Sequence, residues 1–141
     1  SEILTGRLYI SDLSVAHDQD GLARLGITHV VSVLEPTITP VLGPSFTQLH
    51  VGIEDSFRTN ILQHFDRTTE FIRKALADND NCKVLVHCMM GMSRSVAVVC
   101  AYLIAEKSMT SPDAIAYVRS RRSIARPNVG FAQQLEAYAK R

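Results

Sequence analysis

The residues whose types and spacing are best suited to catalysis are Cys88 and Arg94, which are separated by five residues. A cysteine thiolate is a strong nucleophile. An arginine guanidinium can bind two phosphate oxygens side by side, which a lysine ammonium cannot do. The intervening residues are Met89, Met90, Gly91, Met92 and Ser93. This spacing predicts that Cys88 attacks a phosphorus atom while Arg94 binds the phosphate oxygens.

The segments on either side of this loop predict a strand and a helix. Lys83–His87 has the apolar, β-branched character of a buried strand, and Ser95–Lys107 is typical of a buried helix. A tight loop between them can turn successive backbone N–H groups inward, toward the positive end of the helix dipole. Gly91 permits the backbone angles that this curvature needs. We therefore expect residues 89–94 to form a phosphate-binding loop that favours the thiolate form of Cys88.

The neighbours of the loop suggest supporting roles. The Ser95 hydroxyl could hydrogen-bond the sulfur and make it a better leaving group once it carries phosphate. His87 either orients the loop and the thiolate or is a satisfied core histidine, and the sequence favours neither interpretation. In the alternative interpretation of the whole motif, Cys88 is a small buried core residue and Arg94 a surface charge. The ordered series of His, Cys, Gly and Ser-Arg-Ser disfavours that alternative.

With these residues in place, the chain resembles the small atypical dual-specificity protein phosphatases of the cysteine-dependent protein tyrosine phosphatase superfamily. The landmarks that carry the resemblance occur in order at residues 8–10, 25–31, 84–88, 101–103, 126–131 and 134–135. Ser11-Asp12 departs from the family, where Gly-Ser is common at this turn. The resemblance implies an α/β fold with a mixed central β-sheet flanked by α-helices. It also implies a single catalytic domain over residues 1–141 and a phosphocysteine intermediate.

An acid is needed to protonate the leaving oxygen when phosphate moves to sulfur. By resemblance this general acid falls on Asp55, in a loop that follows the expected strand Phe46–Val51. Glu54 is the rival acid, and either carboxylate could instead be an ordinary solvated loop residue. The same acid could later act as the base for the water that hydrolyses phosphocysteine. This chemistry requires no metal and no cofactor.

The remaining elements follow from hydrophobic periodicity and capping signals. Further strands are expected at Arg7–Ile10 and Thr28–Val33, and helices at Asp18–Leu25, from about Asn60, and from Ser111 to about Arg122. The helix that follows Asn60 has an apolar stripe. Asn128 is expected to cap a last helix. By resemblance Asn128 also supports the site.

Substrate class is less clearly indicated by the sequence. Relatives specific for phosphotyrosine carry an extra segment that deepens the pocket, and this chain has no room for it, which favours dual specificity. The three methionines add no charge to the loop, which disfavours inositol lipids; they either form an adaptable apolar rim or pack against the core. Arg122 and Arg126 are candidates for a substrate rim that attracts a second phosphate or acidic residues. The alternative is that they are solvated cations at a helix end.

Composition and charge narrow the partners. The 141 residues include 46% hydrophobic residues, enough for one core, and the net charge is +1. We expect phosphorylated protein substrates and neither nucleic acid nor membrane partners, because a net charge of +1 gives little support for nucleic-acid binding and there is no long apolar span. The sequence contains no pattern that indicates the oligomeric state. A phosphatase for RNA 5′ ends or a lipid, and a weakly active phosphopeptide-binding module, are the alternative functions.

The cysteines indicate a reducing compartment. Their number, three, is odd and no secretory leader precedes them, so we expect a cytoplasmic or nuclear protein and no disulfide scaffold. Cys82 and Cys100 lie too far along their elements from Cys88 to pair with it. We expect both to be core residues.

Overall fold

The computed structural model describes all 141 residues and contains one five-stranded sheet in the order β1-β2-β5-β3-β4. The strands are β1 (Glu2–Leu4), β2 (Leu8–Ser11), β3 (His29–Val33), β4 (Thr47–Val51) and β5 (Val84–His87). β1 pairs with β2 in the antiparallel direction, and every other neighbouring pair is parallel. The predicted mixed sheet is therefore confirmed. β1 is an addition that the sequence did not indicate.

The central strands are short apolar runs, as expected for parallel strands covered on both faces. Every residue of β2 and of β5 is buried. β4 lies at the edge, and its polar residues Gln48 and His50 are half-buried. The parallel register places the carboxyl ends of β2, β3 and β5 side by side, so that Ser11 and Ser32 both lie opposite His87.

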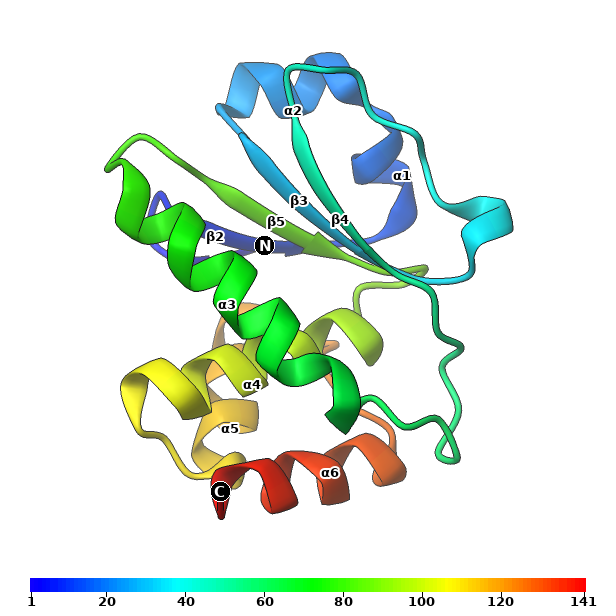
Figure 1. Ribbon diagram of the computed structural model, residues 1–141, viewed down its shortest axis with the longest axis vertical. Coiled ribbons are helices and arrows are strands. Elements are labelled where there is room, and N and C mark those ends of the chain that lie inside the picture. The colour runs from blue at the N-terminus through cyan, green and yellow to red at the C-terminus, as the bar shows by residue number, and fades with distance from the viewer.

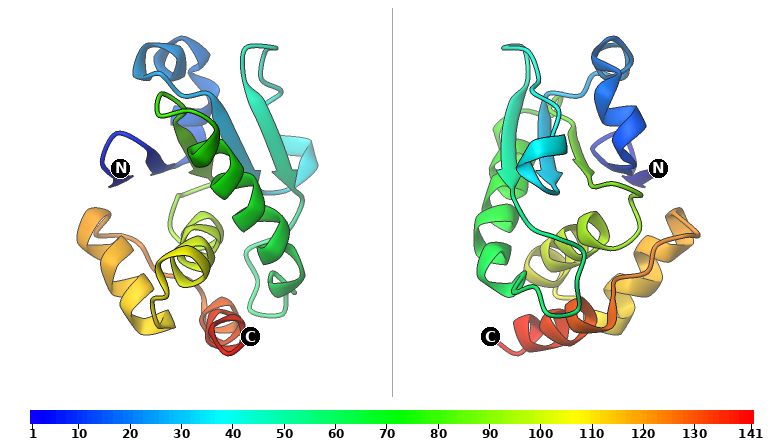
Figure 2. Two further views of the ribbon diagram at one scale, coloured as in Figure 1. Left: turned by 60° about the vertical axis from the view of Figure 1, so that its left-hand side comes forward. Right: turned by 90° about the vertical axis from the view of Figure 1, so that its right-hand side faces the viewer.

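Two short helices, α1 (Leu13–His17) and α2 (Gln19–Leu25), cover one face of the sheet, as Figures 1 and 2 show. The helix predicted at Asp18–Leu25 is confirmed as α2, with Asp18 as its N-cap. The Asp18 side chain accepts a hydrogen bond from the Gly21 N–H at 3.0 Å, and Gly26 ends the helix in the left-handed region at φ 86°. The sequence did not indicate α1, which has only five residues and too little length for a helical period.

Four helices lie on the other face of the sheet (Figure 1). They are α3 (Leu62–Asp78), α4 (Arg94–Lys107), α5 (Ser111–Arg121) and α6 (Val129–Ala139), and a 3-10 turn, η1 (Pro36–Ile38), lies between β3 and β4. α4 is apolar around its whole circumference and is buried from Arg94 to Ile104. α3, α5 and α6 pack around it. No helix combines the length and the apolar character that crossing a bilayer would require.

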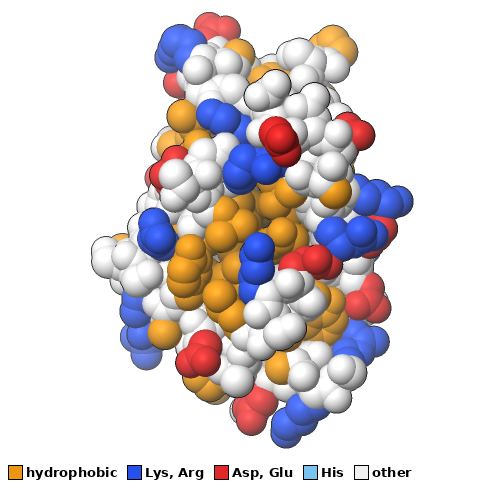
Figure 3. All heavy atoms as spheres, turned by 90° about the vertical axis from the view of Figure 1, so that its left-hand side faces the viewer, with side chains coloured by type: hydrophobic (Ala, Val, Ile, Leu, Met, Phe, Trp, Pro, Cys, Tyr) orange, Lys and Arg blue, Asp and Glu red, His pale blue; other side chains and the backbone are white.

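The face on the left of Figure 1 shows how the β1–β2 hairpin meets the helices. Figure 3 shows apolar side chains gathered in the middle of this face, with Lys and Arg side chains around them. The Tyr117 hydroxyl of α5 donates a hydrogen bond to the Ile3 carbonyl of β1 at 3.1 Å. The guanidinium of Arg121 lies over the Tyr117 ring, 5.4 Å from its centroid. The bond from Tyr117 to Ile3 joins α5 to the β1–β2 hairpin. The second strand of this hairpin ends at Ser11, opposite His87.

Two details differ from the sequence-based expectation. Each of the four predicted strands begins one residue later than expected. Cys100 is buried as expected, but Cys82 is only half-buried and lies in the turn before β5, so its assignment to the core was wrong. A residue in a short connection between a helix and a strand faces solvent on one side, whatever the polarity of its side chain. All three cysteines are free.

Candidate active site

The loop from Cys88 to Ser93 leaves the carboxyl end of the central strand β5 and leads directly into α4. Cys88 is almost fully buried, with 2% of its surface exposed. Its sulfur lies 3.1 Å from the Ser95 hydroxyl oxygen on the first turn of the helix. Gly91 has φ 66°, in the left-handed region that favours glycine. The strand, tight loop and helix predicted around the cysteine are therefore present.

The carbonyl groups of the loop are bound from its outer side. The Leu13 N–H donates to the Met89 carbonyl at 3.1 Å, and the Arg126 N–H donates to the Met92 carbonyl at 2.7 Å. Arg122 donates from Nε to the Gly91 carbonyl at 2.7 Å and from Nη2 to the Met90 carbonyl at 3.1 Å. In a trans peptide the N–H points opposite to the carbonyl. The N–H groups of residues 90–93 therefore point away from these donors, as an anion-binding nest requires.

Arg94 is fixed at one end of its guanidinium. Its Nη1 atom donates to a carboxylate oxygen of Glu35 at 2.7 Å and to the Ile53 carbonyl at 2.9 Å. The side chain of Arg94 is 7% exposed, whereas that of Glu35 is 41% exposed. The hydrogen bond from Arg94 holds the pKa of the Glu35 carboxyl below its usual value, so that Glu35 stays ionised.

The other edge of the guanidinium is the edge that matches a phosphate. The Nε atom of Arg94 is buried and has no hydrogen-bond partner. A buried, unpaired donor costs free energy, and its presence in a folded protein calls for a functional explanation. The Nε and Nη2 hydrogens share one edge and can bind two phosphate oxygens in parallel. Since Arg94 closes the loop that begins at Cys88, this geometry fits a bound phosphate next to the sulfur.

His87 is fully buried behind the loop. Its Nε2 atom lies 2.6 Å from the Ser32 hydroxyl, which also accepts a hydrogen bond from the Gln48 amide at 2.9 Å. Burial lowers the pKa of His87 to about 4, so the imidazole is neutral at pH 7. The Ser32 hydroxyl, already an acceptor, has one hydrogen left to donate to Nε2. His87 is therefore bonded through Nε2 alone, because its Nδ1 atom is buried without a hydrogen-bond partner. It supports the end of β5 but is not the fully satisfied core histidine that the sequence also allowed.

The loop that carries the predicted acid lies beside the start of α6. The Asn128 amide donates a hydrogen bond to a carboxylate oxygen of Asp55 at 2.9 Å. Asn128 also accepts from the Phe131 N–H at 2.8 Å, which confirms it as the cap of α6, and its backbone N–H donates to the Ser93 hydroxyl at 2.9 Å. Asp55 is thereby linked to the phosphate-binding loop through one residue. Glu54 is exposed like Asp55, but the structure gives its carboxylate no such bond.

The structure gives different surroundings to Arg122 and Arg126, the two residues suggested above to attract the substrate. The guanidinium of Arg122 contacts the back of the loop and also donates to the Ser1 hydroxyl at 3.1 Å. The side chain of Arg126 is exposed, and only its backbone is bound to the loop. A role of either residue in attracting substrate stays a prediction.

Three residues of the site escaped the sequence analysis. Ser32 lies in β3, Glu35 in the connection after β3, and Gln48 in β4. All three are far from the motif in sequence. The signal that could have found Glu35 is its position directly after a predicted strand. In a parallel sheet the carboxyl ends of neighbouring strands converge on one site. Using that signal requires knowing that β3 lies next to β5, which the sequence did not give.

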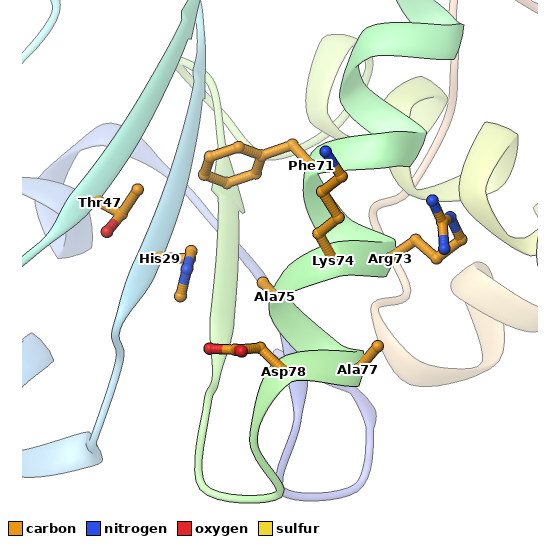
Figure 4. A pocket seen from close by; sticks show the side chains of 8 residues that line it. All are labelled: His29, Thr47, Phe71, Arg73, Lys74, Ala75, Ala77 and Asp78. Carbon is orange, nitrogen blue, oxygen red and sulfur yellow. The ribbon is translucent and has the colours of Figure 1, made fainter.

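A separate hollow of about 450 Å³ lies between α3 and the amino ends of β3 and β4 (Figure 4). In Figure 4 the side chains of His29 and Phe71 lie near each other on its wall, and their rings meet edge to face with centroids 5.6 Å apart. The register pairs His29 with Val84 at the start of β5, so the hollow lies at the opposite end of the sheet from Cys88. None of the residues predicted for the site lines it.

Known proteins resemble this chain in sequence and in structure. The family model described as "Dual specificity phosphatase, catalytic domain" matches residues 8–141. Tyrosine-protein phosphatase yvh1 of Schizosaccharomyces pombe is 39% identical over 136 residues, which cover 96% of this chain and 40% of that protein. Dual specificity protein phosphatase 22 of Mus musculus is 37% identical over 140 residues, which cover 99% of this chain and 73% of the relative.

The solved structures agree. The crystal structure of human tyrosine phosphatase-like serine/threonine/tyrosine-interacting protein superposes with a TM-score of 0.91 at 37% identity. The match covers 99% of this chain and 94% of that one. The phosphatase-like α/β fold expected from the sequence is therefore confirmed.

Proposed function

Because this chain belongs to the dual specificity phosphatase family, we propose that it hydrolyses phosphotyrosine, phosphoserine and phosphothreonine in proteins through a phosphocysteine intermediate. We infer that residues 1–141 form one catalytic domain for this reaction. Supporting the reaction, the buried and unpaired Nε atom of Arg94 lies in the same loop as the Cys88 sulfur. A phosphate bound by that guanidinium satisfies the orphaned donor and brings phosphorus to the nucleophile.

The first half of the reaction transfers the phosphoryl group to sulfur. The Cys88 thiolate forms a bond to phosphorus while the bond from phosphorus to the substrate oxygen breaks. Asp55 gives its proton to the departing oxygen, so that a neutral alcohol or phenol leaves. The inward N–H groups of the loop and the free edge of Arg94 stabilise the negative charge on the phosphoryl oxygens.

The second half releases inorganic phosphate. Asp55, now a carboxylate, accepts a proton from a water molecule whose oxygen attacks phosphorus. The bond between phosphorus and sulfur breaks, and the sulfur leaves as a thiolate that the Ser95 hydroxyl, 3.1 Å away, can stabilise by donating a hydrogen bond. The chain returns to its starting state with one ester bond hydrolysed.

A thiolate nucleophile also bears on location. We infer that the protein works in a reducing compartment, the cytoplasm or the nucleus, because its three cysteines are free and Cys88 must stay reduced.

The test of the intermediate is the replacement of Cys88. We expect Cys88→Ser to abolish hydrolysis of p-nitrophenyl phosphate while phosphopeptide binding is retained, and rapid quench of the unmodified protein with a ³²P-labelled phosphopeptide to trap labelled protein. Cys100→Ser and Cys82→Ser are the matched controls and should keep turnover. If Cys88→Ser hydrolyses the ester at the original rate, the mechanism is wrong. If the unmodified protein binds phosphopeptides but never turns over, the protein is a phosphopeptide-binding module.

Asp55 as the acid predicts a dependence on the leaving group. Asp55→Asn should lower kcat on phosphoserine peptides by about 100-fold or more, because an alkoxide must be protonated as it leaves. The loss on p-nitrophenyl phosphate should be much smaller, since nitrophenolate leaves without a proton. Glu54→Gln is the control and should leave both rates near those of the unmodified protein. The opposite pattern, with the larger loss in Glu54→Gln, would move the acid to Glu54.

A further inference from the structure

The exposed apolar side chains of this molecule gather around the phosphate-binding loop. Nine large hydrophobic residues are exposed in the whole chain, and five of them belong to the loop or to the two segments beside it. These five are Met89 (39% exposed), Met90 (59%), Met92 (37%), Phe57 (60%) and Ile124 (49%). We call them the apolar rim. Three of the chain's four methionines lie in it.

The rim is held together by the contacts that build the site. The backbone of Arg126, two residues after Ile124, is bonded to the Met92 carbonyl at 2.7 Å. Phe57 follows Asp55, which Asn128 holds at 2.9 Å. A Cβ atom added to Gly130 would collide with the backbone of Phe57, so that segment packs directly on α6. In the right-hand view of Figure 2, the start of α4 lies between residues 52–60 and residues 122–128. The segments that carry the apolar rim therefore lie beside the loop that begins at Cys88.

The other exposed apolar residues do not join this surface. Val15 and Leu25 line a hollow on α1 and α2, and Val129 lines a groove between α5 and α6. Val41 lies in the connection between η1 and β4. They are the scattered single residues that any soluble surface carries.

The charges near the loop do not suit a strongly acidic ligand. Arg122 is the cation nearest the back of the loop, and its guanidinium donates to the Gly91 and Met90 carbonyls and to Ser1. Arg58 lies over the Phe57 ring, 5.5 Å from its centroid. Arg58 and Arg126 have exposed side chains, and the exposed carboxyl group of Glu54 lies in the same loop as Arg58. The charges near the loop are therefore mixed in sign and partly engaged in other contacts, whereas the exposed side chains of the rim are all apolar.

We propose that the apolar rim binds hydrophobic side chains on either side of the phosphorylated residue, so that the preferred substrates are phosphopolypeptides with apolar flanks. This proposal rests on the function proposed above and adds the class of sequence that the site selects. Contiguous exposed apolar surface marks an interaction site. Methionine is flexible and polarizable, so it fits differently shaped apolar partners. A polypeptide is the occupant because three rim residues belong to the phosphate-binding loop and the other two to segments bonded beside it, where residues adjacent to the phosphoresidue can reach them.

The experiment compares matched phosphopeptides. Two peptides share a central phosphotyrosine or phosphoserine, and the flanking residues are Leu and Met in one and Asp and Glu in the other. We expect kcat/KM to be about tenfold higher for the apolar peptide, as burial of one or two apolar side chains gives. Phe57→Gln and Ile124→Gln should each reduce this ratio, and Phe57→Lys should shift it further toward the acidic peptide. Val41→Gln and Leu25→Gln, which change exposed apolar residues elsewhere, should leave the ratio unchanged.

The ratio is taken within each variant, so changes in the chemical step cancel. Equal rates on the two peptides, or a preference for the acidic one, overturn the proposal although the phosphatase activity stands. If the protein hydrolyses neither p-nitrophenyl phosphate nor peptides, the proposed function fails, and the Kd values of the same peptides then test the rim by themselves. Faster hydrolysis of phosphatidylinositol phosphate in vesicles would assign the rim to a lipid surface. Self-association that Phe57→Gln removes would assign it to a second copy of the chain, and either result overturns the proposal.

Discussion

Glu35 acts on the phosphate through Arg94. Its carboxylate holds Nη1 at 2.7 Å, on the side of the guanidinium away from the free Nε edge. Without that carboxylate the guanidinium can rotate and lose the orientation that two parallel hydrogen bonds to phosphate require. We infer that Glu35 positions the guanidinium of Arg94 and does not itself contact the phosphate.

We predict that Glu35→Ala lowers kcat/KM on p-nitrophenyl phosphate by about 10- to 100-fold, the range in which misplaced catalytic groups fall. Glu35→Gln keeps a hydrogen-bond acceptor for Nη1 and should lose less. Glu70→Gln, which removes an exposed ion pair with Arg73, serves as the control. Steady-state kinetics and the inhibition constant of inorganic phosphate are the measurements. Unchanged values of both in Glu35→Ala would show that the ion pair has no part in phosphate binding.

Asn128 combines a structural bond and a functional one. Its side chain caps α6 through the Phe131 N–H and holds Asp55 through the other amide atom. Serine caps helices about as well as asparagine but is too short to serve both partners. The two tasks can therefore be separated by choosing the substitution.

We predict that Asn128→Ser keeps the free energy of unfolding but lowers kcat on phosphoserine peptides, because Asp55 loses its hydrogen-bonded position. Asn128→Ala should lose the same activity and, in addition, about 1 kcal/mol of the free energy of unfolding. Urea unfolding and single-turnover kinetics measure the two quantities independently. Equal kcat values in Asn128→Ser and the unmodified protein would mean that the Asp55 loop is held by other contacts.

At the scale of the element, the loop that joins β5 to α4 owes its shape to Gly91. The residue has φ 66°, and a Cβ atom placed there would lie 2.6 Å from a guanidinium nitrogen of Arg122 and 2.7 Å from the Ser11 carbonyl oxygen. The second of these atoms is backbone at the end of β2 and cannot move aside easily. The loop and the strand beside it can approach so closely only at a glycine.

Gly6 offers a matched comparison, because its φ is 71° and a Cβ atom there meets nothing within 4 Å. We predict that Gly6→Ala costs about 1 to 2 kcal/mol from backbone strain alone. Gly91→Ala should cost more, because overpacking typically adds about 1 to 3 kcal/mol, and should also abolish measurable turnover. Chemical denaturation and p-nitrophenyl phosphate hydrolysis test both variants. A Gly91→Ala protein that is as stable and active as Gly6→Ala would contradict this account of the loop.

At the scale of the whole molecule, His87 makes the free energy of unfolding depend on pH. Burial lowers the pKa of this histidine to about 4, whereas an unfolded chain holds it near 6.5. Between these pH values the unfolded state binds more protons than the folded state, so the free energy of unfolding rises with pH. Above about pH 6.5 the imidazole is neutral in both states and contributes no pH dependence.

We predict that His87 makes the protein about 2 kcal/mol less stable at pH 5 than at pH 7.5, within a limit of about 3 kcal/mol reached near pH 4. Burial lowers the pKa of His29 and His64 as well, so the pH dependence of the unmodified protein alone does not isolate His87. His87→Gln keeps a polar side chain beside Ser32 without titrating in this range. Urea unfolding of both proteins at the two pH values gives the difference, and parallel losses in both would exclude His87 as the cause.

The chemistry of the site was predicted from local sequence because it is built from neighbours along the chain. Cys88, Gly91, Arg94 and Ser95 lie within eight residues, and the strand and helix around them have clear hydrophobic patterns. Capping signals are equally local, which is why Asn128 was predicted correctly as a helix cap and the helix at Asp18–Leu25 was predicted to within one residue. The elements that escaped notice, β1 and α1, are three and five residues long. Such segments are stabilised by the partners that they pack against and carry too few residues for a period of their own.

What the amino-acid sequence determined by itself is therefore the α/β class and the strand, tight loop and helix around the proposed nucleophile, since each depends on spacing along the chain. Only the tertiary structure decided that Glu35 holds Arg94, that Asn128 joins Asp55 to the loop, and that Arg122 binds the loop carbonyls. Those contacts join residues 31 to 73 positions apart. Partners so distant in sequence are brought together by the order of parallel strands and the packing of α5 and α6 around α4, which no local pattern encodes.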